Sequence, residues 1–246
     1  MIRVGVLGAK GRMGATVCDA VNAADDMELI AALDQGDSLD ELVSNGAQVV
    51  VDFTVPESVM GNLTFALAKN IHAVVGTTGW DDDRLNQVRS LQSTSQANVV
   101  IAPNFGLAAV LMMQFAAKAS PYFDSVEIVE LHHPRKADAP SGTARRTAEM
   151  ITEARRLTGS HPMPDATRDV LDGARGAVVG DVRVHSVRLQ GLVAHQEVLL
   201  GGPGESLTIR HDSYDRESFM PGVLLGVREV GNLPGVTFGL EHVLGI

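Results

Sequence analysis

The sequence has little cysteine, few aromatic residues and no long apolar run, and each shortage excludes a class of protein. One cysteine, Cys18, among 246 residues excludes an internal disulfide framework and a cysteine-rich zinc site. This lone thiol, together with the lack of an apolar signal segment, predicts a protein of the reducing cytoplasm. No apolar run approaches the roughly 20 residues of a membrane helix, so we expect no membrane partner.

Basic residues are also scarce, since 20 lysines and arginines stand against 30 acidic residues and give a net charge of -10. A nucleic-acid partner requires a basic face, and aromatic residues, at 4%, are too few for base-stacking platforms. We therefore expect no nucleic-acid partner. In so acidic a chain, the position of any local basic cluster is informative.

The first half of the chain alternates apolar strands with helices. Strands are predicted at 2–7, 27–33, 48–53, 73–75 and 99–102, and helices at 12–24, 56–69 and 82–91. This order predicts right-handed βαβ units and an α/β fold with a Rossmann-like, doubly wound parallel sheet. Ligands of such sheets bind beyond the carboxyl ends of the strands.

The second half predicts a second α+β domain with a mostly antiparallel sheet. A strand at 126–131 and a helix at 141–157 precede a long Gly- and Pro-rich loop at 159–180. Three strands with alternating apolar and polar residues follow, at 182–189, 194–200 and 206–211. A mostly helical segment at 217–231 follows these strands. We therefore predict one domain at 1–105 and 216–246, interrupted by a second domain at 106–215.

The first candidate site is the loop between the first strand and the first helix, Gly8-Ala9-Lys10-Gly11-Arg12-Met13-Gly14. Its glycines allow a tight turn and let the backbone approach a pyrophosphate, which the helix N-terminus then faces. Asp34 ends the next strand, where a carboxylate can accept a hydrogen bond from a ribose hydroxyl. Together these features favour dinucleotide binding over a turn that only packs a helix on a strand. Lys10 and Arg12 either pair with a 2′-phosphate, which would admit NADPH beside NADH, or are solvated surface charges.

Two further loops end strands at the same predicted rim. They are Gly76, Thr77, Thr78 and Gly79 after the fourth strand, and Ala102, Pro103, Asn104 and Phe105 after the fifth. Small residues at a strand end let a flat ring approach the backbone. Each loop alone is typical of an ordinary turn, but the two together predict the nicotinamide end of a cofactor site.

The densest basic cluster lies within 130–144, and its basic residues are His132, His133, Arg135 and Lys136. Ser141 is suited to cap the following helix, whose first backbone N–H groups can hold a carboxylate. Adjacent histidines on a strand point to opposite faces, so we predict no metal site. No G-x-S-x-G turn surrounds Ser141, which disfavours a nucleophilic serine. A small-anion site and a capped surface loop remain as interpretations.

The segment from Glu130 to Ala144 resembles the signature E-x-H-H-x-x-K-x-D-x-P-S-G-T-A of the dihydrodipicolinate reductase family at every specified position. The glycine loop and both rim loops are also similar to the cofactor loops of that family. The resemblance implies reduction of a cyclic dicarboxylate imine, 4-hydroxy-tetrahydrodipicolinate, by NADH or NADPH on the route to diaminopimelate and lysine. It also implies a homotetramer assembled through the sheets of the second domain.

The resemblance further implies a role for each matched residue. His132 would be the acid/base group and Lys136 the proton donor. The substrate would be bound by His133, Ser141, Gly142, Thr143 and Arg216. The cofactor would be held by Gly8, Ala9, Lys10, Gly11, Arg12, Met13, Asp34, Gly76, Thr77, Thr78, Ala102, Pro103, Asn104 and Phe105. Gln35 stands where members that favour NADPH often have a basic residue, so phosphate selectivity would depend on Lys10 and Arg12.

Three alternatives differ in what they require of the sequence. Another Rossmann dehydrogenase, for example one acting on a semialdehyde, would share the glycine loop without needing the basic segment. A dinucleotide sensor would bind NADH without turnover, and a surface adaptor would bind no cofactor at all.

Overall fold

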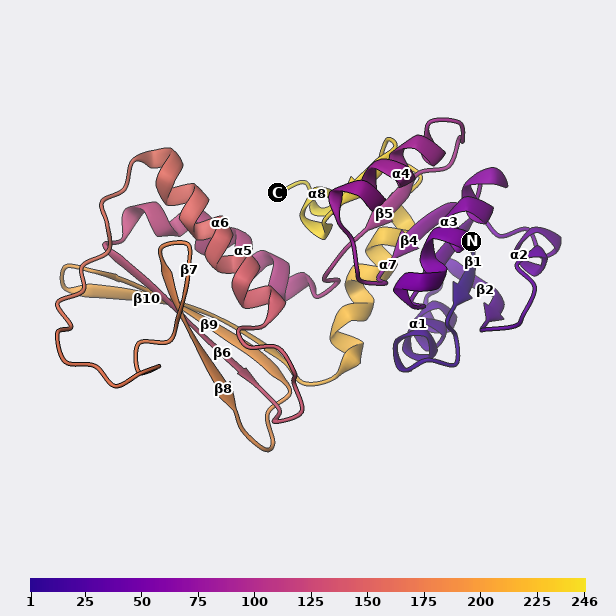
Figure 1. The fold of residues 1–246 in the computed structure, drawn as a ribbon. Coiled ribbons are helices and arrows are strands. Elements are labelled where there is room, and N and C mark those ends of the chain that lie inside the picture. Colours follow the sequence, from indigo (N-terminus) through magenta and orange to yellow (C-terminus); the bar gives the residue numbers. More distant parts are fainter. The chain divides into compact units, whose positions relative to one another are not determined.

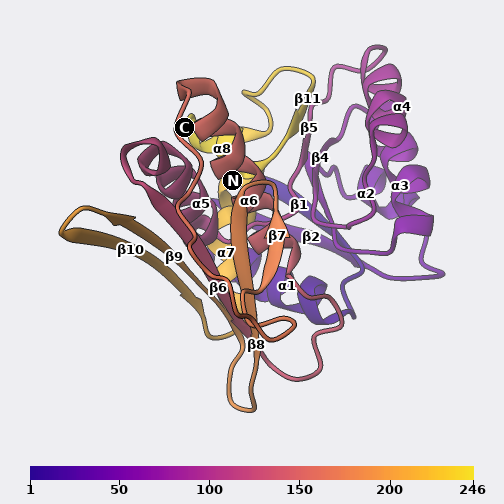
Figure 2. The same cartoon turned by 60° about the vertical axis from the view of Figure 1, so that its left-hand side comes forward.

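The computed structural model describes residues 1–246, which form two compact units (Figures 1 and 2). Unit 1 comprises Met1–Leu107 and Arg216–Ile246, and unit 2 comprises Ala108–Asp215. None of the helices combines the length and the apolar character that crossing a bilayer requires.

Unit 1 is built around a six-stranded parallel sheet with the strand order β11-β5-β4-β3-β1-β2. The strands are β1 (Ile2–Leu7), β2 (Met27–Leu33), β3 (Val49–Asp52), β4 (His72–Val75), β5 (Val99–Ile101) and β11 (Val236–Phe238). The chain moves outward from β1 to β2 on one side and to β3 on the other. The order therefore reverses between β1 and β3, and the predicted doubly wound sheet is confirmed.

Helices cover both faces of this sheet. They are α1 (Arg12–Ala23), α2 (Asp40–Ser44), α3 (Pro56–Ala68), α4 (Asp82–Gln92), α7 (Met220–Glu229) and α8 (Leu240–Leu244), with a 3₁₀ turn η2 (Arg216–Phe219) before α7. Val74 and Val75 of β4 point to opposite faces. Val74 lies against Gly226 of α7, whereas Val75 packs in the cluster of α3. Apolar strands are thus explained by burial on both faces.

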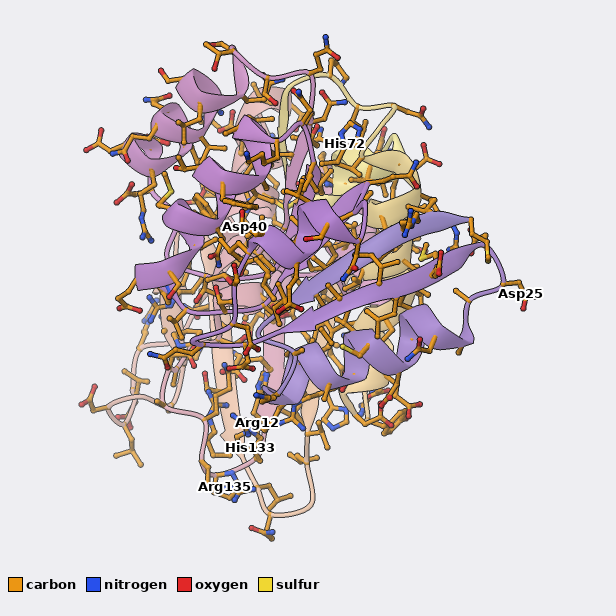
Figure 3. The ribbon with its side chains drawn as sticks, turned by 90° about the vertical axis from the view of Figure 1, so that its right-hand side faces the viewer. Arg12, Asp25, Asp40, His72, His133 and Arg135 are labelled. Atoms are coloured by element: carbon orange, nitrogen blue, oxygen red, sulfur yellow. The ribbon has the colours of Figure 1, made fainter.

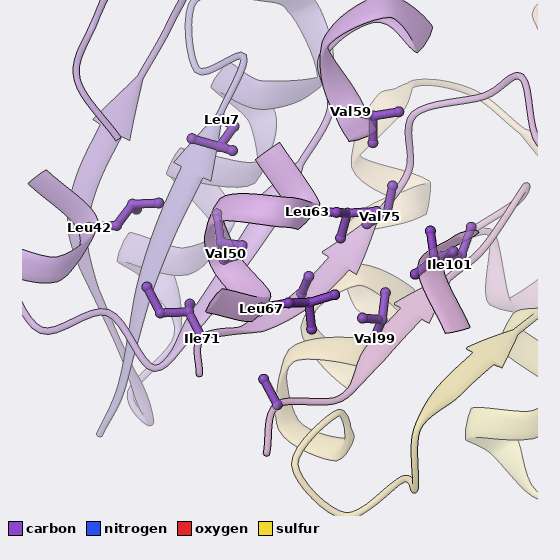
Figure 4. Packing of buried hydrophobic residues seen from close by; sticks show 14 of the residues in the cluster. Leu7, Leu42, Val50, Val59, Leu63, Leu67, Ile71, Val75, Val99 and Ile101 are labelled. Atoms are coloured by element: carbon purple, nitrogen blue, oxygen red, sulfur yellow. The ribbon is translucent and has the colours of Figure 1, made fainter. Parts of the chain in front are cut away.

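A cluster of buried hydrophobic residues lies between α3 and the sheet (Figure 4). Leu63 and Leu67 of α3 pack over Val50, Val75 and Val99, and all five side chains are almost fully buried. The helix presents these leucines one turn apart, so a single face supplies the apolar contact. This packing holds β3, β4 and β5 against α3, and the candidate loops begin at the carboxyl ends of these strands.

Unit 2 is a second α+β domain, as predicted. Its elements are α5 (Leu107–Ala119), η1 (Ser120–Tyr122), β6 (Ser125–His132), α6 (Gly142–Thr158), β7 (Ala177–Val179), β8 (Val182–Arg188), β9 (Ala194–Gly202) and β10 (Glu205–Ser213). The sheet has the order β10-β9-β6-β8-β7, and only the β6–β8 pairing is parallel. Figure 2 shows α5 and α6 on one face of this sheet.

Several elements differ from the sequence-based prediction. The predicted loop at 159–180 contains the short strand β7. Of the strands predicted to be antiparallel, β8 is antiparallel to β7 but parallel to β6. The helix α5 carries buried residues on most of its surface, so it lacks the polar face that reveals a helix in a sequence. The short elements α2, β11 and α8 also escaped prediction because a few residues carry no clear period.

Candidate functional site

In unit 1 the glycine loop makes a tight turn between β1 and α1. Gly8 has a φ of 78°, and a side chain on Gly14 would place its Cβ only 2.0 Å from the carbonyl oxygen of Gly8. Gly11 caps α1 without any side-chain hydrogen bond. The first N–H groups of α1 are therefore not capped by a side chain, as binding of a phosphate requires. These residues fit a pyrophosphate.

Asp34, at the end of β2, is tied directly to this loop. Its carboxylate accepts hydrogen bonds from the backbone N–H groups of Gln35 and Lys10, both at 2.8 Å. These two bonds lower the pKa of Asp34, so the side chain is a carboxylate at neutral pH. The side chains of Lys10 and Arg12 are exposed, and Figure 3 places Arg12 and Asp25 at opposite ends of α1.

The loops that follow β3 and β4 meet at a buried carboxylate, Asp52. It accepts hydrogen bonds from the hydroxyls of Thr77 at 2.8 Å and Thr54 at 2.7 Å, and from the Asn62 amide at 2.8 Å. Asp52 is absent from the predicted site, although a charged residue at the end of an otherwise apolar strand marks it in the sequence.

Aromatic packing joins the third candidate loop to the same edge. The ring of Phe53 lies 5.9 Å from that of Phe105, and a Cβ on Gly76 would lie 2.1 Å from the Phe53 ring. Asn104 accepts a hydrogen bond from the N–H of Gly106 at 2.8 Å, while Pro103 is exposed. The structure thus gathers the candidate cofactor residues at the carboxyl edge of the unit 1 sheet.

In unit 2 the basic segment connects β6 to α6 and folds back on the start of that helix. The Lys136 ammonium donates to Asp138 Oδ1 at 2.7 Å, and the other Asp138 oxygen accepts from the N–H of Gly142 at 3.2 Å. The bond from Lys136 is the main cause of the lowered pKa of Asp138. Lys136 is therefore held beside the first residue of α6.

Ser141 is the N-cap of α6, because its hydroxyl accepts a hydrogen bond from the N–H of Ala144 at 3.2 Å. Thr143 lies in the first turn, and its carbonyl accepts from the hydroxyl of Thr147 at 2.7 Å. Thr147 in turn accepts from the buried amide of Gln196 on β9 at 2.9 Å. The start of the helix is thus anchored to the sheet.

His132 ends β6, and its Nδ1 lies 2.5 Å from Glu130 Oε2. Burial lowers the pKa of His132, and its bond to Glu130 only partly opposes that effect. The Nδ1 of His133 is buried without a hydrogen-bond partner. Figure 3 places His133 and Arg135 close together in the connection that follows β6.

The predicted site residues fall in both units. His132, Lys136, Ser141 and Gly142 share one network in unit 2, through Glu130 and Asp138. Arg216 instead begins η2 in unit 1 and is exposed.

Arg188, which was not predicted as a site residue, also belongs to the unit 2 network. Arg188 on β8 donates to both oxygens of Glu130 at 2.8 Å. Glu130 had a signal, because it opens the signature segment. Arg188 had none, since it lies 58 residues away along the chain.

Comparison with protein families matches the whole chain in two parts. Residues 2–105 match the model described as dihydrodipicolinate reductase, N-terminus, and residues 108–244 match the model described as its C-terminus.

Individual relatives are similar over their full length. The 4-hydroxy-tetrahydrodipicolinate reductase of Streptomyces avermitilis is 62% identical over 100% of this chain and 98% of that protein. The reductase of the same name from Nocardia farcinica is also 62% identical, over 100% of this chain and 99% of the relative. Dipicolinate-bound dihydrodipicolinate reductase from Paenisporosarcina sp. TG-14 is 41% identical and superposes with a TM-score of 0.89, covering 98% of this chain and 99% of the other. The chain therefore belongs to the dihydrodipicolinate reductase family, as its signature segment predicted.

Proposed function

We propose that this chain reduces 4-hydroxy-tetrahydrodipicolinate to tetrahydrodipicolinate with NADH or NADPH, in the biosynthesis of diaminopimelate and lysine. Its family and the names of its full-length relatives support this activity. The observation that carries the assignment of residues is the network that links His132, Lys136 and the capped start of α6.

Unit 1 is proposed to bind the cofactor, which supplies a hydride when bound. The loop from Gly8 to Met13 would hold the pyrophosphate at the start of α1, and Asp34 would bind a ribose hydroxyl. Gly76, Thr77, Thr78, Ala102, Pro103, Asn104 and Phe105 would line the nicotinamide end. The exposed cations Lys10 and Arg12 are suited to a 2′-phosphate, which supports use of NADPH as well as NADH.

Unit 2 is proposed to bind the dicarboxylate. One substrate carboxylate would take the place of the Asp138 oxygen at the N–H of Gly142 and would also bind the N–H of Thr143, beside the Ser141 cap at the positive end of α6. His133 would contact the substrate, and its buried, unpartnered Nδ1 is consistent with a ligand contact. Arg216 is proposed as a further substrate-binding residue on the family resemblance alone.

Two side chains are proposed to manage charge as the imine is reduced. Electron density rises at the substrate nitrogen, and the Lys136 ammonium would stabilise it and deliver a proton. A well-placed donor of this kind is worth roughly 3 kcal/mol in the transition state. His132 would act as the acid/base group beside it.

We propose a homotetramer assembled through the sheets of unit 2, in the cytoplasm. The lone thiol Cys18 is consistent with a reducing compartment. Mass measurement in solution tests the tetramer directly.

One assay tests the proposed reaction. Initial rates are measured with the enzymatically prepared cyclic imine and either NADH or NADPH, following loss of the reduced cofactor. We expect turnover with the imine. Absence of turnover, combined with activity on an aldehyde, would instead identify another dehydrogenase; NADH binding without any turnover would identify a sensor.

A further inference from the structure

Glu130 accepts hydrogen bonds at both of its carboxylate oxygens. It is fully buried on β6. Oε2 accepts from Arg188 at 2.8 Å and meets His132 Nδ1 at 2.5 Å. Oε1 accepts from Arg188 at 2.8 Å and from the N–H of Ser141 at 3.2 Å. One side chain thus contacts two strands and the start of α6.

We propose that Glu130 is a positioning residue, which with Arg188 keeps the ring proton of His132 on Nδ1 and leaves Nε2 as a hydrogen-bond acceptor for the reaction proposed above. The inference rests on that proposed function for its consequence in catalysis. Its structural part, the tautomer of one histidine, can be measured without any turnover.

The ionisation state of Glu130 decides which atom of the His132–Glu130 contact carries the hydrogen. Burial alone would raise its pKa, but hydrogen bonds from Arg188, Ser186 and His132 outweigh burial, and the pKa of Glu130 is lowered. The side chain is therefore a carboxylate at neutral pH. A carboxylate has no proton to donate, so the short contact requires Nδ1 of His132 to carry the hydrogen.

The charge of His132 depends on burial and on neighbouring charges. Besides Glu130, the charged groups that act on the ring are Lys136 and Arg188, and both oppose its protonation. Burial is the largest influence, and it also lowers the pKa of His132. The neutral ring with hydrogen on Nδ1 has its lone pair on Nε2. Nε2 of His132 is thus a hydrogen-bond acceptor, whereas Lys136 is a hydrogen-bond donor in this cluster.

The same carboxylate also fixes the anion-binding end of α6. Arg188 donates to the carbonyl oxygen of Asp138 at 2.7 Å as well as to Glu130. Asp138 holds Lys136 and the N–H of Gly142. Loss of Glu130 would therefore disturb His132, Lys136 and the helix start together, and we expect both kcat and the KM for the imine to change.

The experiment compares the wild-type enzyme with Glu130→Gln, Glu130→Asp and the matched control Glu127→Gln. Glu127 lies on the same strand and also bonds a histidine and an arginine, His185 and Arg175, outside the proposed site. Long-range proton–nitrogen NMR of ¹⁵N-histidine-labelled protein reports the tautomer, with the His132 signals assigned from His132→Gln. Turnover of the imine and NADH affinity by fluorescence are measured in parallel.

We expect the wild-type ring to carry its hydrogen on Nδ1 near pH 7.5. Glu130→Gln should populate the Nε2–H tautomer and lower kcat by about 10- to 100-fold, the usual cost of losing an outer partner of a functional histidine. NADH affinity should stay unchanged, because unit 1 holds the cofactor residues. Glu130→Asp keeps the charge and should recover part of kcat, and Glu127→Gln should match the wild type.

A wild-type ring with hydrogen on Nε2 would overturn the inference, as would Glu130→Gln with an unchanged tautomer and kcat. If Glu130→Gln does not fold, the tautomer of the wild-type protein and of Glu130→Asp still decides. Failure of the proposed function gives a different pattern, in which the tautomer is as expected but the wild-type enzyme does not reduce the imine.

Discussion

Two clusters of the same three residue types lie on opposite faces of β6. On one face Glu130 bonds His132 and Arg188, and on the other Glu127 bonds His185 and Arg175. The Glu130 side chain is 0% exposed and that of His132 is 13% exposed, whereas those of Glu127 and His185 are 31% and 26% exposed. Identical chemistry is therefore set in two different dielectric surroundings.

The hydrogen-bond distances between arginine and glutamate also differ between the two clusters. Both nitrogens of the Arg188 fork reach Glu130 at 2.8 Å, whereas Arg175 makes one short contact of 2.5 Å and a second of 3.4 Å with Glu127. Water can replace part of the Glu127 cluster, but nothing replaces a lost partner of Glu130. The comparison teaches that burial, rather than residue type, decides which cluster can position a catalytic group.

The largest expected difference between the clusters is in catalysis. His132→Gln should lower kcat for the cyclic imine by about 10²- to 10⁴-fold, the usual range for removal of an acid/base group. His185→Gln has the same change of side chain on the other face and should leave kcat within about twofold, a negligible difference in barrier. Initial rates at saturating cofactor test this pair. Equal losses would show that the faces do not differ as argued.

Loss of Arg188 should lower the free energy of unfolding more than loss of Arg175. Arg188→Met leaves Glu130 buried without its cation, which should cost about 3–5 kcal/mol of unfolding free energy. Arg175→Met breaks a more exposed ion pair, which solvent already screens, and should lower the free energy of unfolding clearly less than Arg188→Met does. Urea unfolding followed by circular dichroism measures both. Similar urea midpoints for the two variants would show that the buried and the exposed cluster contribute equally to stability.

Lys136 belongs to the buried cluster, because Asp138 and Arg188 connect it to Glu130. Lys136→Ala should lower kcat by about 10²- to 10³-fold, the usual effect of losing a donor to developing charge. Affinity for NADH should hardly change, and Arg135→Ala, an exposed neighbour, is the control. Normal kcat with weakened NADH binding would contradict the role of Lys136.

The smallest effect is on the pH dependence of stability. Burial lowers the pKa of His132 below its usual 6.5, so the unfolded chain binds this proton more readily than the folded protein. Stability from the neutral ring is therefore complete above about pH 6.5 and is lost as pH falls toward the folded pKa.

His132→Gln should make stability fall less steeply between pH 7.5 and 5.5, a shift visible in urea midpoints at a few pH values. Some slope should remain, since burial also lowers the pKa values of His72 and His211. The lowered pKa of Glu130 acts elsewhere, because its contribution is lost only below its usual 4.5. Parallel curves for wild type and variant would contradict this assignment.

Local patterns explain what could be predicted. The apolar runs of β1 to β5 are short, and glycine, aspartate, threonine or proline follows each of them within a few residues, so neighbouring residues indicate where each strand ends. The turn at Gly8 and the cap at Ser141 are likewise decided within a few residues, because a tight turn and an N-cap each involve one hydrogen-bonded ring. Elements without such local marks, α5 and β11 among them, were not predicted.

The family, the doubly wound sheet of unit 1 and the segment that carries His132 and Lys136 could all be predicted from the order of residues. The place of β6 between β8 and β9, which brings Arg188 onto Glu130, is visible only in the folded chain. The two residues are far apart in the chain, and no local pattern encodes which strand will lie beside which. Pairing of distant strands depends on the burial of whole faces, and that burial also sets the ionisation of the groups between them.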